Sequence, residues 1–92
     1  MYRISLVCHG VPPDHGDAAA TDIAEEFTYR PWHEAVKCSW DGKFLLLEAE
    51  NDYDFNGLAL LDEFSDAIAA CIAPAFDGRI EILSVQKFDA EA

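Results

Sequence analysis

The sequence predicts a 92-residue α+β domain, a ferredoxin-like βαββαβ sandwich in which a four-stranded antiparallel sheet carries two helices on one face. Three observations predict this fold. Four segments alternate apolar and polar residues with a strand period, two show helical i, i+3, i+4, i+7 spacing, and turn residues separate them in the order β-α-β-β-α-β. A different strand order built from the same six elements is the alternative. We expect one domain over residues 1–92, with 88–92 as a frayed tail.

The first third of the chain predicts a strand and then a helix. Residues 2–9 alternate with period two, and the stretch 10–16, rich in Pro and Gly, ends that strand. Asp14 or Asp17 is the expected N-terminal cap of the helix, and Arg30-Pro31 is its expected end, because proline excludes the preceding residue from the α region. The inward stripe of the helix is Ala20, Ile23, Ala24 and Phe27.

The rest of the chain predicts a hairpin, a second helix and a last strand. Asp41-Gly42 is a two-residue turn signal between alternating segments at 34–40 and 43–50. The polar stretch 51–57 leads into a helix that runs from Leu58 to about residue 73. We expect Asp54 or Asn56 to cap this helix, Pro74 to end it, an Asp77-Gly78 turn to follow, and a strand to span 79–87.

Such a sandwich leaves one face of its sheet open. If Ile4, Leu6 and Cys8 face the helices, we expect an apolar patch on the other face. A homodimer or a partner protein would cover the patch, whereas a register shift of one residue would remove it. The last strand alternates less clearly: Ile80 and Ile82 are expected on one face and Glu81, Leu83 and Val85 on the other. The expected patch consists of Val7, Phe44, Leu46 and either Leu83 or Ile82.

Charge is the unusual property of the composition. Eighteen Asp and Glu residues oppose six Lys and Arg residues, for a formal net charge of −12. A surface this negative repels nucleic acid and anionic membrane and attracts cationic partners over long distances. We therefore expect a basic protein as the partner, and neither nucleic acid nor a membrane. A second interpretation is that the acidity serves only solubility.

Cysteine and histidine positions favour neither a disulfide framework nor a metal site. Cys8, Cys38 and Cys71 are widely spaced, lie in apolar segments and form no CxxC pair, which predicts reduced structural thiols. The histidines match no zinc-ligand spacing, so we expect no metal and no cofactor. Because no apolar run reaches the ~20 residues that span a bilayer, we expect a cytoplasmic protein.

The stretch from Glu48 to Asp54 is the sharpest local feature, and it has four interpretations. Clustered carboxylates bind hard cations, supply acid–base pairs, or contact a basic partner. The stretch can also be a solvated corner whose Asp and Asn residues cap the second helix.

These observations favour an acidic protein-binding module over an enzyme, and we assign no catalytic residue. The expected module is an inhibitor, immunity-type or nucleic-acid-mimic protein that occupies the basic site of a partner such as a nuclease. Exposed aromatic residues, including Tyr29 and Phe55, would anchor the contact unless they pack at helix ends. The expected partner-binding residues are Trp32, Glu48, Glu50, Asp52, Tyr53, Asp54, Asp62, Glu63 and Asp66.

Two alternatives stay open. One is a small dimeric enzyme or ligand sensor that uses His9, His33 and either Arg3 or Arg30 near the open sheet face. It predicts a concave pocket lined by convergent polar groups. The other is a structural or assembly subunit, which needs no acidic binding site.

Overall fold

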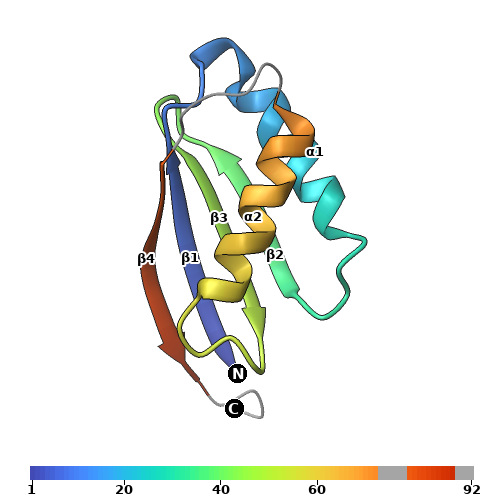
Figure 1. Ribbon diagram of the computed structural model, residues 1–92, viewed down its shortest axis with the longest axis vertical. Helices are drawn as coiled ribbons and strands as arrows, with labels where there is room; N and C mark the ends of the chain where they lie inside the picture. Colours follow the sequence, from blue (N-terminus) through green and yellow to red (C-terminus); the bar gives the residue numbers. More distant parts are fainter. Residues whose placement is uncertain (73–78, 89–92) are drawn as a thin grey trace.

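The computed structural model describes residues 1–72 and 79–88 and confirms the predicted architecture. One antiparallel sheet has the strand order β2-β3-β1-β4, and both helices pack on the same face of it (Figure 1). Within the described residues, no helix is long and apolar enough to cross a membrane. The elements are β1 (Tyr2–His9), α1 (Gly16–Phe27), β2 (Glu34–Trp40), β3 (Leu45–Asn51), α2 (Leu58–Cys71) and β4 (Arg79–Lys87).

The core lies between the sheet and the two helices. Alternation along β1 and β3 places every second side chain on the helix side, and α1 and α2 cover these residues with their apolar stripes. Leu47 at the centre of β3 and Phe64 of α2 are fully enclosed. The largest enclosed side chains are Ile4, Leu6, Ile23, Leu45, Leu47, Leu60 and Phe64.

The two boundaries of α1 differ from the prediction. Neither Asp14 nor Asp17 caps the helix, because a 3-10 turn over Pro13–His15 runs directly into Gly16. Gly16 itself lies against the indole of Trp40, where any side chain would collide with the ring. The helix ends at Phe27, three residues before Arg30, since the backbone N–H groups of residues 28–30 each bond three residues back and tighten the last turn.

The hairpin between β2 and β3 is confirmed, but its turn lies one residue later than the sequence indicates. The backbone N–H of Asp41 donates to Phe44 O at 3.2 Å, so Gly42 and Lys43 are the central residues, and Gly42 has a φ of +95°. The Asp41 carboxylate accepts hydrogen bonds from the backbone N–H groups of Phe44 and Lys43, which lower its pKa. The partner strand therefore begins at Leu45.

The last strand contains a β-bulge that the sequence does not reveal. Ser5 pairs with Ser84 and the next residue, Leu6, pairs with Ile82, so Leu83 is the extra residue. The bulge turns Leu83 toward the open face, as predicted, and places Val85 against the core with Ile82, which corrects the expected alternation.

The C-terminal boundary is described only in part. The expected Pro74 helix end, the Asp77-Gly78 turn and residues 89–92 of the expected tail lie outside the described residues. Phe88, by contrast, is held in place: its backbone N–H donates to Met1 O at 2.9 Å, and the Arg3 guanidinium carbon lies 4.8 Å from its ring centroid.

Candidate partner-binding surface

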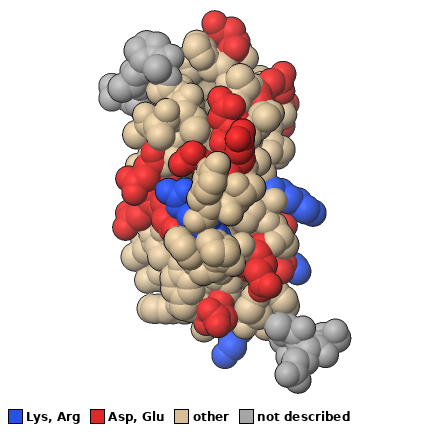
Figure 2. All heavy atoms as spheres, turned by 90° about the vertical axis from the view of Figure 1, so that its right-hand side faces the viewer, with Lys and Arg blue, Asp and Glu red and all other residues tan. Residues whose placement is uncertain are grey.

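The outer surface of the helix layer is anionic throughout. Neither helix contains a Lys or Arg residue, although α1 and α2 together span 26 residues. Seen from the α1 side, carboxylates are spread over this surface with few basic side chains among them (Figure 2). The seven helical carboxylates belong to Asp17, Asp22, Glu25, Glu26, Asp62, Glu63 and Asp66.

The Glu63 carboxylate joins the end of α1 to the beginning of α2. It accepts hydrogen bonds from Trp32 Nε1 at 3.2 Å and from His33 Nε2 at 2.5 Å, and it pairs with Arg30 Nε at 3.3 Å. Arg30 also lies 3.8 Å from Glu26. Glu63 was expected to lie outward, but only 20% of its side chain is exposed. Glu63 therefore holds the loop between α1 and β2 in place, and its carboxylate is engaged by these internal contacts.

His33 is buried, and its two ring nitrogens have defined roles. Asn51 Oδ1 accepts the backbone N–H groups of Tyr53 and Asp54, so its Nδ2 is the atom that faces His33. Because that Nδ2 donates to His33 Nδ1 at 3.2 Å, Nδ1 is an acceptor and the ring proton lies on Nε2, which donates to Glu63. This chain of hydrogen bonds connects Asn51 of β3 to Glu63 of α2 through His33, in the loop that precedes β2.

The loop from β3 to α2 uses its polar residues as caps. Both oxygens of the buried Asp54 carboxylate accept backbone N–H groups at the start of α2, Ala59 at 3.2 Å and Leu60 at 2.9 Å. Asn56 accepts the N–H of Leu58, so both predicted side chains bond backbone groups of the first turn, but the N-cap position itself is Gly57, with a φ of +79°. The Asp54 carboxylate is thereby satisfied inside the protein and is not exposed to a partner.

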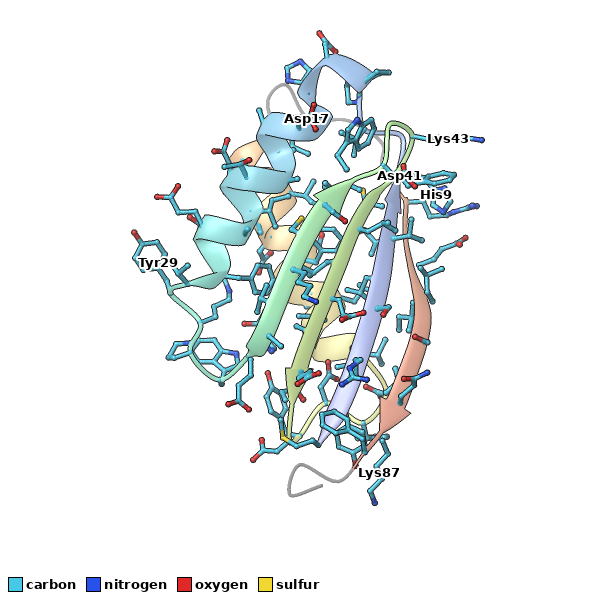
Figure 3. All side chains as sticks on the ribbon, turned by 180° about the vertical axis from the view of Figure 1, so that it is seen from behind. His9, Asp17, Tyr29, Asp41, Lys43 and Lys87 are labelled. Carbon is cyan, nitrogen blue, oxygen red and sulfur yellow. The ribbon has the colours of Figure 1, made fainter. Side chains whose placement is uncertain are left out.

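Large apolar side chains are exposed at this end of the molecule. Tyr29 is 72% exposed, Trp32 50%, Tyr53 46% and Phe55 69%, all at the ends of the helices and in the adjoining loops. Tyr29 projects outward beyond the end of α1 (Figure 3). Desolvation and the charges of Glu63, Asp54 and Asp52 raise the pKa of Tyr53, which shows that its ring lies among carboxylates.

Of the three thiols, Cys71 is the one whose pKa responds to the charge of the helix layer. Burial, followed by the nearby carboxylates of Glu26 and Asp22, raises the pKa of Cys71 on α2. Burial raises the pKa of Cys8 to about 11 and that of Cys38 to about 12. All three thiols are free and protonated near neutral pH, which leaves them unsuited to nucleophilic chemistry.

The predicted partner-binding residues do not form a single patch. Glu48 and Glu50 lie on the open sheet face, where Glu48 accepts from Ser5 Oγ at 3.4 Å and Glu50 pairs with Arg3 at 2.8 Å. Asp54 and Glu63 are engaged internally, as described above. The exposed members at or near the helix layer are Trp32, Asp52, Tyr53, Asp62 and Asp66.

Strand alternation explains why the stretch from Glu48 to Asp54 separates. Glu48 and Glu50 point to one face of β3, while Asn51 points to the other and is buried.

Across residues 1–72 and 79–88, no group of three or more His, Cys, Asp or Glu side chains is placed to hold a metal ion.

The sequence did not single out the exposed carboxylates of α1. Asp22 and Glu25 are not among the predicted partner-binding residues, but they stand near Cys71 of α2 and extend the same anionic surface. The absence of Lys and Arg from both helical segments is the signal that identifies them. We define the acidic-aromatic surface as Asp22, Glu25, Trp32, Asp52, Tyr53, Asp62 and Asp66.

The open sheet face carries a hollow that bears on the ligand-sensor alternative. A hollow of about 320 Å³ lies between Leu46 and Leu83, with Ser5, Lys37 and Glu48 at its polar wall. None of the four residues expected near this face lines the hollow: His33 and Arg30 contact Glu63 in the helix layer, and Arg3 and His9 lie elsewhere on the open face. No protein-family model, curated protein or solved structure matches this chain.

Proposed function

We propose that the protein is a binding module whose acidic-aromatic surface occupies a basic site of another protein, and that a nuclease or other nucleic-acid-binding protein is the class of partner. The observation that carries the proposal is the helix layer itself. Its two helices carry seven carboxylates and no cation, and all but the internally bonded Glu63 are available to a partner, next to exposed Trp32 and Tyr53. A site that binds phosphates is rich in Lys and Arg, and carboxylates pair with the same groups.

Charge and aromatic residues have different tasks in this proposal. The carboxylates of both helices accelerate encounter with a basic surface and align the two proteins. Trp32 and Tyr53 then supply the apolar area that is desolvated on contact, as aromatic anchors do in many interfaces. Trp32 is oriented before binding by its hydrogen bond to Glu63, so little side-chain freedom is lost in the complex.

The proposal is tested by neutralising one face at a time. The helix-layer variant carries Asp22→Asn, Glu25→Gln, Asp62→Asn and Asp66→Asn. The matched sheet-face variant carries Glu34→Gln, Glu48→Gln, Glu50→Gln and Glu81→Gln and changes the net charge equally. Tagged wild type captures its partner from source-cell lysate, mass spectrometry identifies it, and titration calorimetry with the purified partner compares the three proteins.

We expect the helix-layer variant to lose binding and the sheet-face variant to retain it. Wild-type affinity should fall by about tenfold or more between low and moderate salt, because long-range charge attraction is screened. Equal binding by both variants, or affinity that does not respond to salt, would contradict the proposal.

Inhibition is measured separately from binding. Saturating wild type should abolish the partner's binding to nucleic acid, and any nuclease activity, while the helix-layer variant leaves both intact. Full activity of the partner in the saturated complex would show that the acidic-aromatic surface does not occupy its basic site.

A further inference from the structure

The open face of the sheet differs in charge from the rest of the surface that the structure describes. Register pairing places four of the 18 acidic residues and three of the six basic residues on it. The other described residues include eleven acidic ones, of which Asp54 is buried, and three basic ones, Arg30, Lys43 and Lys87. The charged residues of the open face are Arg3, Lys37 and Arg79 with Glu34, Glu48, Glu50 and Glu81.

Opposite charges on this face are interleaved. Arg3 pairs with Glu50 at 2.8 Å, and Arg79 pairs with Glu81 at 3.0 Å. Lys37 stands across from Glu48 in the register of β2 and β3 but forms no ion pair with any described carboxylate. A face on which acidic and basic residues nearly balance neither attracts a strongly basic protein nor repels the same face of a second copy.

The same face is also apolar and uneven. Val7 lies on this face but is only 4% exposed, Leu46 is half-buried, and Leu83 at the bulge of β4 is 58% exposed beside the hollow. No helix lies in front of these strands in Figure 3, which views the sheet from the side opposite the helices. A protruding side chain beside a hollow is self-complementary under a two-fold rotation, which places each protrusion opposite the other copy's hollow.

We propose that the open sheet face binds a second copy of this chain in a symmetric, face-to-face dimer. Leu83 of each copy enters the hollow of the other, and Lys37 pairs with a carboxylate across the interface. The charge balance carries this choice of occupant: a basic partner is drawn to the helix layer, whereas the sheet face matches itself. Such a dimer presents an acidic-aromatic surface on each of its two outer sides.

The dimensions of the sheet set the expected affinity. With four strands about 4.8 Å apart and eight residues in β1 at about 3.3 Å each, the face covers roughly 500 Å² in projection. This is at the small end of specific interfaces, so we expect a micromolar dimer. Because each copy carries a net charge of −12, salt screens the mutual repulsion of the helix layers, and dimerisation should hold or strengthen as salt rises.

Sedimentation equilibrium tests the proposal over protein concentrations from about 5 µM to about 500 µM, the range that a micromolar dimer requires. The wild type should rise from its monomer mass of 10.2 kDa toward twice that value. Leu83→Glu should remain monomeric throughout. Leu58→Glu is the matched control, since Leu58 on α2 is 54% exposed and Leu83 58%, and it should dimerise like the wild type.

A second pair of variants tests the charge argument. Lys37→Glu places one more carboxylate on the sheet face and should weaken dimerisation at least tenfold, whereas Lys87→Glu makes the same change at the end of β4 and should not. Unchanged circular dichroism and urea midpoints show that each variant is folded. Salt separates the two proposals, since partner binding weakens with salt and dimerisation does not.

Three outcomes would overturn the dimer. The first is a wild type that stays monomeric at every concentration. The second is a dimer that survives Leu83→Glu or is lost in Leu58→Glu, which would place the interface elsewhere. The third is a monomeric wild type that loses its basic partner on Leu83→Glu, because the sheet face would then bind that partner instead of a second copy.

Discussion

The helix layer and the open sheet face are polar surfaces of one small chain, but they arrange charge in different ways. The helices carry seven carboxylates and no cation, and their charge is relieved mainly by Arg30, which lies outside both helices. On the sheet, cross-strand register sets Arg3 against Glu50 and Lys37 against Glu48. The helices thus contribute −7 to the net charge of −12 and the sheet face only −1, so composition alone does not predict the charge of a given face.

The largest expected effect compares the two faces of a single strand. Leu47 on the helix side of β3 is 1% exposed, whereas its neighbour Leu46 faces the open side. Leu47→Ala should lower the free energy of unfolding by about 2–5 kcal/mol, because it leaves a cavity in the core. Leu46→Ala should cost about 1 kcal/mol or less, as expected for a partly exposed side chain. Urea denaturation at low protein concentration measures both, and equal losses would contradict the assignment of faces.

The next effect distinguishes two neighbouring acids of α2. Glu63→Ala removes the acceptor shared by Arg30, Trp32 and the buried His33, and should cost about 2 kcal/mol because donors are left unsatisfied. Asp62→Ala, on the exposed side, should change stability by less than about 0.5 kcal/mol. Glu63→Ala should also alter Trp32 fluorescence. Equal stabilities of the two variants would show that the Glu63 contacts contribute nothing.

A smaller effect tests the cap of α2. Asp54→Ala removes the carboxylate that accepts the N–H groups of Ala59 and Leu60, and should cost about 1 kcal/mol. Asp52→Ala in the same loop makes the same change at an exposed position and should be nearly neutral. Thermal unfolding compares the two variants. A loss of stability in Asp52→Ala as large as that in Asp54→Ala would contradict the assignment of the cap to Asp54.

The smallest expected effect is a change in the pKa of the Cys71 thiol, which reports the negative charge of the helix layer. Asp22→Asn with Glu26→Gln removes two charges that raise the pKa of Cys71, so its pKa should fall and its alkylation at pH 8 should become faster. The sheet-face change Glu48→Gln with Glu81→Gln should leave the rate unchanged. Peptide mapping by mass spectrometry resolves each thiol, and burial keeps Cys8 and Cys38, with pKa values of about 11 and about 12, slow in every variant.

The sequence was sufficient to predict the fold, because hydrophobic periodicity and turn residues act locally. The segments 2–9, 34–40 and 79–87 coincide with β1, β2 and β4. Prediction failed where a tertiary contact or hydrogen-bond geometry sets a helix boundary or a strand register. No local sequence pattern indicates the close approach of Gly16 to Trp40, the tightened turn after Phe27 or the bulge at Leu83.

The candidate site was less accessible to sequence reasoning than the fold. Exposure of Trp32, Tyr53, Asp62 and Asp66 agrees with the expected outward positions, since helical spacing and polar loops predict it. The engagement of Glu63 by His33 joins residues 30 positions apart, and no pattern in the sequence indicates that pairing. Glu48 and Glu50 were grouped with the loop carboxylates because proximity in sequence was taken for proximity on the surface.

The contacts of Glu63 also determine when, during synthesis and folding, the chain becomes able to bind its partner. Residues 28–33 are synthesised before α2, yet the acceptor that orients Trp32 belongs to α2. In a chain whose α2 has not yet packed against the sheet, Trp32 is exposed but lacks the hydrogen bond to Glu63 that orients it. The anchor is completed only when the whole sandwich has formed, so a nascent or truncated chain should not compete for the partner of the finished protein.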